Sequence, residues 1–103
     1  MIKTIMDAAR VPFRESRFIK PPAGTYAVFM DDMETDGPDG MNRIFTHNIT
    51  LEVYETKPDD KAEAAIEAAL DAQGLHYTKQ ARYWLQTEQR YQVIYEFSYI
   101  IKK

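Results

Sequence analysis

The sequence contains no cysteine, only two serines and only four glycines among its 103 residues. The lack of cysteine excludes disulfide bonds, thiolate metal sites and thiol nucleophiles. Ser16 lies in a basic stretch and Ser98 in a predicted strand, so neither occupies the Gly-x-Ser-x-Gly turn that exposes a nucleophilic serine. The glycines are scattered at predicted turns, which argues against a phosphate-binding loop.

Long apolar runs are also absent. No stretch approaches the roughly 20 apolar residues that a membrane-crossing helix needs. The first ten residues lack the apolar core of a signal peptide. We therefore expect a soluble protein that stays in the cytoplasm and does not bind membranes. With 45% hydrophobic and 28% charged residues, the chain suits one folded domain over residues 1–103.

Metal and acid–base sites have weak support in the sequence. His47 and His76 are the only histidines, and neither has the partner four residues away that a helical zinc site needs. The acidic stretch at 32–37 resembles the first half of a calcium-binding EF-hand loop, but Arg43 stands at the twelfth position, where a bidentate glutamate is required. We therefore predict no catalytic residue, no cofactor and no metal, and a protein that is not an enzyme.

The net charge of −3 hides a marked segregation of charge. Residues 1–20 carry five basic and two acidic groups, whereas residues 31–40 carry five acids and no base. Residues 59–73 are again acidic, and residues 74–103 carry five bases against two acids. Two interpretations stay open at this point. The charges form ordinary solvated faces, or they form a self-complementary surface through which copies of the chain associate.

Hydrophobic periodicity predicts two helices and four strands. An apolar stripe at helical spacing opens the chain, and a second, alanine-rich stripe follows Asp60, which we expect to be its N-cap with Glu63 three residues on. Gly74 is suited to end that helix. The predicted elements are a helix over 2–10, strands over 25–30 and 42–56, a helix over 60–73, and strands over 77–86 and 91–101. This order predicts an α+β fold, a four-stranded antiparallel sheet with two helices packed on one face.

An acidic loop is predicted over residues 31–40 (DDMETDGPDG). Two glycines and a proline favour turns, and five carboxylates cannot bury a face. The candidate site residues are those carboxylates, for which we expect a partner-facing or lumen-facing role. They are Asp31, Asp32, Glu34, Asp36 and Asp39.

The last hairpin is rich in tyrosine, but its register is open. An even turn near 87–90 places Trp84 beside the aromatic face of the last strand, and an odd turn places Tyr83 and Leu85 there. Aromatic residues on a sheet also allow an RNA-stacking surface. The absence of an RNP-like run and the net negative charge argue against specific nucleic-acid binding.

Nearly the whole chain resembles a known family in the pattern and order of its segments. The segments are VPF, PPAGTYAVFMDD, THNITLEVYET, DDKAEAAIEAALDAQGL and YWLQTEQRYQVIYEFSY. Together they resemble the small tail-terminator, or tail-completion (head–tail joining), proteins of long-tailed bacteriophages and prophages. No catalytic motif is part of this resemblance.

The resemblance implies a structural virion protein that assembles as a homo-hexameric ring and is monomeric until the tail offers a template. Such a ring caps the tail tube and joins the tail to the head connector, so the implied partners are further copies, the tail-tube protein and the head-connector protein. The implied location is the virion tail, after assembly in the host bacterial cytoplasm. A ring needs one patch to meet a different patch on the next copy, which suits the segregated charge. The alternative is a small ligand-binding or regulatory α+β module unrelated to tails.

Overall fold

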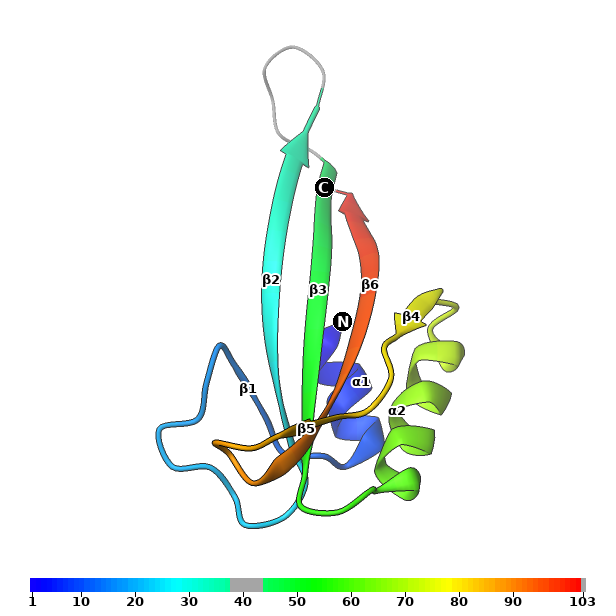
Figure 1. Ribbon diagram of the computed structural model, residues 1–103. Coiled ribbons are helices and arrows are strands. Elements are labelled where there is room, and N and C mark those ends of the chain that lie inside the picture. The colour runs from blue at the N-terminus through cyan, green and yellow to red at the C-terminus, as the bar shows by residue number, and fades with distance from the viewer. Residues whose placement is uncertain (38–43, 103) are drawn as a thin grey trace.

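The computed structural model describes residues 1–37 and 44–102 of the chain. Within them lie two helices and six strands, which Figure 1 shows. In chain order they are α1 (Ile2–Ala9), β1 (Phe13–Glu15), β2 (Tyr26–Asp36), β3 (Ile44–Glu55), α2 (Asp60–Ala72), β4 (Tyr77–Lys79), β5 (Tyr83–Leu85) and β6 (Arg90–Lys102).

The fold is α+β, as expected, but the predicted four-stranded antiparallel sheet is wrong. The sheet is mixed and six-stranded, in the order β1-β2-β3-β6-β4, with β5 also pairing to β6. The strand β1 pairs in parallel with β2, and all other pairs are antiparallel. The single strand predicted over 77–86 is divided into β4 and β5.

The unpredicted strand β1 arises in a proline-containing stretch that reads locally as loop. The N–H of Ala27 donates to the carbonyl of Pro12 at 2.9 Å, which starts the parallel pairing. The ring of Phe13 lies 6.4 Å from that of Phe29. These contacts are long-range, so local composition could not reveal them.

The break between β4 and β5 has an equally specific cause. Arg82 lies in the break, and its side chain forms ion pairs with Glu55 at the end of β3 and Glu63 on α2. The N–H of Gln80 still donates to the carbonyl of Ile94 at 2.9 Å. The interruption is therefore short, and both strands stay along the same edge of β6.

The core lies between the two helices and one face of the sheet. Alternate residues of β2, β3 and β6 point into it, as the predicted alternation requires. In β3 Ile49, Leu51 and Val53 point inward and are all buried. The remaining buried members of the core are Ile5, Met6, Ala9, Val11, Ala27, Phe29, Ile66, Ala69, Leu70, Val93, Tyr95, Phe97 and Tyr99.

The N-cap of helix α2 lies one residue earlier than the predicted Asp60. It is Asp59, whose Oδ1 accepts from the N–H of Ala62 at 3.0 Å. The other oxygen of Asp59 accepts from the hydroxyl of Thr25 at 2.6 Å, which ties the helix to the start of β2. Gly74 follows the helix with φ +68°, as expected of a terminating glycine.

Three strands extend well beyond the helices, as Figure 1 shows. We call this extension the arm; it consists of residues 30–36 of β2, 44–50 of β3 and 97–102 of β6. The molecule is accordingly elongated, 50 Å along its longest axis and 27 Å and 22 Å along the others. Its two sheet faces there are the helix-side face, continuous with the core, and the open face opposite.

Candidate functional site

The acidic residues lie on a strand rather than in the loop predicted over 31–40. The strand β2 continues through Asp36 because β3 pairs with it along its full length, as far as Asp36 opposite Ile44. Asp31, Asp32, Glu34 and Asp36 are therefore strand residues of the arm, a correction to the loop. Asp39 lies outside the described residues.

Strand alternation divides the four described carboxylates between the two faces. Asp32, Glu34 and Asp36 point to the open face and are exposed. Asp31 points to the helix-side face and is half-buried. The structure thus brings three of the predicted carboxylates together and separates the fourth from them.

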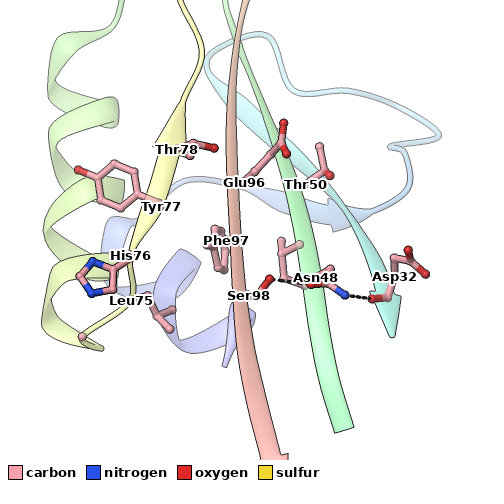
Figure 2. Close-up of a pocket in the computed structure, with 12 residues that line it drawn as sticks. Asp32, Asn48, Thr50, Leu75, His76, Tyr77, Thr78, Glu96, Phe97 and Ser98 are labelled. Carbon is pink, nitrogen blue, oxygen red and sulfur yellow. Dashed lines mark hydrogen bonds between the residues drawn. The ribbon is translucent and has the colours of Figure 1, made fainter. Parts of the chain in front are cut away.

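A polar ladder crosses the open face at the level of Asp32. The hydroxyl of Ser98 on β6 donates to Oδ1 of Asn48 on β3 at 2.7 Å. The Nδ2 of Asn48 donates in turn to the carbonyl of Asp32 on β2 at 3.1 Å, and Figure 2 shows both bonds. This ladder ties the three strands of the arm together on the face opposite the core.

The helix-side face of the arm holds Asp31 in a defined contact. The Nδ1 of His47 lies 2.7 Å from Oδ2 of Asp31, and both side chains are largely buried. The His47 ring stacks on Tyr99, with 4.8 Å between ring centroids and 12° between planes. Burial, together with the charge of Asp31, raises the pKa of the Tyr99 hydroxyl. His47 thus serves packing and pairing within the sheet.

An open groove of about 700 Å³ lies beside β6 where the arm begins. One wall is the segment after α2, with Leu75, His76 and Tyr77, and the other is β6 with Phe97 and Ser98. Figure 2 shows Leu75, His76 and Tyr77 on one side of the β6 ribbon, and Asp32, Asn48 and Thr50, which also line the groove, on the other. Sequence reasoning missed this groove, because it depends on β4 ending early along β6.

A second polar cluster lies at the opposite end of the sheet. The carboxylates of Glu55 and Glu63 are buried, and Arg82 reaches both, at 3.3 Å and 2.7 Å. Burial raises the pKa of Glu55 to about 7, and the neighbouring Glu63 adds to the rise. Burial alone would also raise the pKa of Glu63, but hydrogen bonds from Glu55, Lys79 and Arg82 outweigh it and lower that pKa. A protonated Glu55 can donate to ionised Glu63, so the pair is stable with one shared charge.

The same cluster continues along α2 and β4. The ammonium group of Lys79 lies 2.9 Å from Glu63 and 2.8 Å from Glu67. The buried hydroxyl of Tyr95 donates to Glu67 at 2.7 Å. These contacts hold β4 and β6 against helix α2, so the carboxylates of Glu63 and Glu67 serve to stabilise the fold.

The register of the last hairpin is settled by the pairing of β5 with β6. Trp84 lies opposite Tyr91, with ring centroids 4.9 Å apart, so the turn is the even one. Tyr83 is 65% exposed and Trp84 38% exposed, whereas Tyr95 is fully buried. The tyrosine-rich segment therefore supplies both core and surface.

Within residues 1–37 and 44–102, no three histidine or acidic side chains are grouped so as to hold a metal ion. In the same part of the chain, no helix combines the length and apolarity that membrane crossing requires. The charged groups around Glu55 and Glu63 are paired with one another, and none of them lines the groove.

No protein-family profile matches the chain, and no curated protein matches it in sequence. A solved structure, a chain of the virion of a native gene transfer agent particle, superposes with a TM-score of 0.64. The match covers 96% of this chain and 84% of that chain at 15% sequence identity. The chain therefore shares the fold of a virion-particle chain over nearly its full length.

Proposed function

We propose that this protein is a structural subunit of a phage or prophage virion that caps the tail tube and joins the tail to the head connector as a self-assembling ring. The observation that carries the proposal is the fold shared with a chain of a gene transfer agent virion, over 96% of this chain. The segment pattern that resembles tail-terminator proteins leads to the same role. The ring is homo-hexameric in the assembled tail, and its further partners are the tail-tube and head-connector proteins.

The arm gives the ring an orientation. The helices cover one sheet face, so a ring with its helices outward turns the open face toward the lumen. Asp32, Glu34 and Asp36 then line the lumen, while Asp31 does not, because it faces His47. Carboxylates along a channel repel DNA phosphates and keep them from adhering. The subunit acts through shape and charge, without catalysis or a cofactor.

Deleting the gene from a producing strain tests this function. We expect full heads and tails that do not join, or tails of irregular length, in negative-stain micrographs. Expression of the protein in trans restores joined particles, and a tagged copy is located by immunogold at the head–tail junction. Normal joined particles from the deletion strain would contradict the proposal.

The groove beside β6 favours one alternative, a small ligand-binding or regulatory module. Its volume of about 700 Å³ is adequate for a small molecule, although its open shape is unlike the enclosed sites that bury most of a ligand. A thermal-shift screen with a metabolite library separates the two functions. A ligand that stabilises the protein, with normal particles after gene deletion, would favour the module.

A further inference from the structure

The arm has two open strand edges. On one side, β1 pairs with β2 only as far as Phe29, so among the described residues 30–36 have no neighbour beyond β2. On the other side, β4 pairs with β6 only as far as Phe97, so in the described part of the chain 98–102 have no neighbour beyond β6. Open edges of this kind present backbone donors and acceptors to another strand.

The two edges run in the same direction and lie at the same height. Both β2 and β6 are antiparallel to β3, so they are parallel to each other. The shared partner β3 sets their levels: Glu34 and Ile100 both face Thr46, and Asp36 and Lys102 both face Ile44. In a ring whose axis runs along the strands, the rotation that relates neighbouring copies changes neither the height nor the direction of a strand. It therefore brings β6 of one copy beside β2 of the next in parallel register.

The chemistry of the edges favours this contact over pairing of like edges. The β2 edge carries four carboxylates in seven residues, so two β2 edges repel one another. The β6 edge carries exposed Ile100 and Ile101, followed by Lys102. At equal height, Lys102 of one copy meets Asp36 of the next. The two edges thus differ from one another and carry opposite charges at Lys102 and Asp36, as suits a head-to-tail ring.

We propose that residues 98–102 of β6 pair in parallel with residues 30–36 of β2 in the next copy, which joins the arms into one closed sheet with the open face inward. This inference rests on the proposed ring and names the interface within it. The segregated charge of the chain then acts between copies, at the arm.

The lower part of each copy limits how far this pairing extends. Below the arm, β4 flanks β6 and β1 flanks β2, so two more strands lie between neighbouring copies there. At a strand spacing of about 4.8 Å, they widen the gap by roughly 10 Å. The ring is therefore narrowest at the arm, and the groove beside Ser98 provides room where the copies diverge.

Cysteine cross-linking tests the interface directly, because the natural chain has no cysteine. In one copy Glu34 and Ile100 are separated by β3, about 10 Å apart, which is too far for a disulfide within the chain. The variant with Glu34→Cys and Ile100→Cys is oxidised mildly, as purified protein at high concentration and in isolated particles. We expect a ladder of disulfide-linked species up to the full ring.

The matched control carries Lys57→Cys and Asp71→Cys, two exposed positions away from the arm. It should give no ladder. The two single variants of the arm, when mixed, should give dimers only. Absence of the ladder from both samples, or an equal ladder from the control, overturns the interface.

A charge exchange gives a second readout. Lys102→Glu alone and Asp36→Lys alone should each lower the fraction of subunits assembled into rings about tenfold, measured by their incorporation into isolated particles and by native mass spectrometry of concentrated protein, because like charges then meet at each junction. The double variant restores the pairing of opposite charges and should return to within about twofold of the natural protein. Rings that form undiminished in both single variants overturn the interface.

The outcomes separate this inference from the proposed function. If the protein is located at the head–tail junction but gives no ladder of disulfide-linked species, the edge pairing is wrong and the tail role stands. If purified protein gives the disulfide-linked ladder but the deletion strain still makes normal joined particles, the tail role is wrong and the edge pairing stands.

Discussion

The two halves of the sheet are built on different principles. The half beneath the helices has a closed core with fully buried Leu51, Val53 and Tyr95. In the arm the core narrows to Ile49, Phe97 and Tyr99, and the strands are held further by backbone pairing, by the Ser98–Asn48–Asp32 ladder and by the His47–Asp31 contact. Stability therefore resides in the covered half, and the arm is free to vary its surface for contact with other molecules.

The largest effect should separate the halves by apolar truncation. Leu70→Ala removes a fully buried side chain between α2 and the sheet, and we expect it to lower the free energy of unfolding by about 4 kcal/mol. Ile101→Ala in the arm, where the side chain is 40% exposed, should cost less than about 1 kcal/mol. Urea denaturation followed by circular dichroism measures both. Equal losses would mean that the arm contributes to the core.

The buried acid pair should make the covered half sensitive to pH. The pKa of Glu55 rises from 4.5 to about 7 on folding, so the folded state holds a proton that the unfolded state releases between those values. Stability from this group is complete below pH 4.5 and is lost as the pH rises toward 7. Glu55→Gln keeps a donor toward Glu63 without the charge, and above pH 7 it should stabilise the protein by up to about 3 kcal/mol.

The measurement for that variant is the free energy of unfolding from pH 4 to 8.5. The gain should vanish at the acid end, where Glu55 is neutral in both states. Glu52→Gln, on the open face of the same strand, serves as the control and should show no such trend. A gain that is constant with pH would indicate simple relief of packing and would contradict a shared proton.

A smaller effect concerns the start of α2. Asp59→Ala removes both the cap on Ala62 and the bond from Thr25, and should cost about 1 kcal/mol. Asp60→Ala removes only an exposed contact to Arg82 and should cost at most about 0.5 kcal/mol. Thermal unfolding of the two variants compares them. A larger loss of stability for Asp60→Ala than for Asp59→Ala would show that Asp60, the N-cap predicted from the sequence, is the true cap.

The same contrast explains what the sequence could predict. Local periodicity located both helices, the strand β3 and the glycine that follows α2, because these features depend on neighbours along the chain. It failed at β1, at the division of β4 from β5 and at the strand portion of residues 31–36. Each of these depends on a distant partner: Ala27 for β1, the Glu55–Glu63 pair for Arg82, and residues 44–49 for the acidic half of β2.

The candidate site followed the same rule. The carboxylates were visible in the sequence, but their division between two faces required the strand that carries them. The groove beside β6 had no sequence signal, since it exists only because β4 stops at the level of Phe97.

The smallest effect on stability should come from the open face of the arm, and there the loss should be functional. The triple variant Asp32→Asn, Glu34→Gln and Asp36→Asn keeps the shape of three exposed side chains and removes their charge, so we expect a change within about 0.5 kcal/mol in unfolding. Yield of infectious or DNA-transferring particles should nevertheless fall, because the proposed lumen and the proposed contact with Lys102 both need those carboxylates. The matched control neutralises Glu15, Asp71 and Glu88, three exposed acids elsewhere, with the same change in net charge. Equal yields from the two triple variants would show that only total charge matters, and would remove the open face of the arm from the function of this protein.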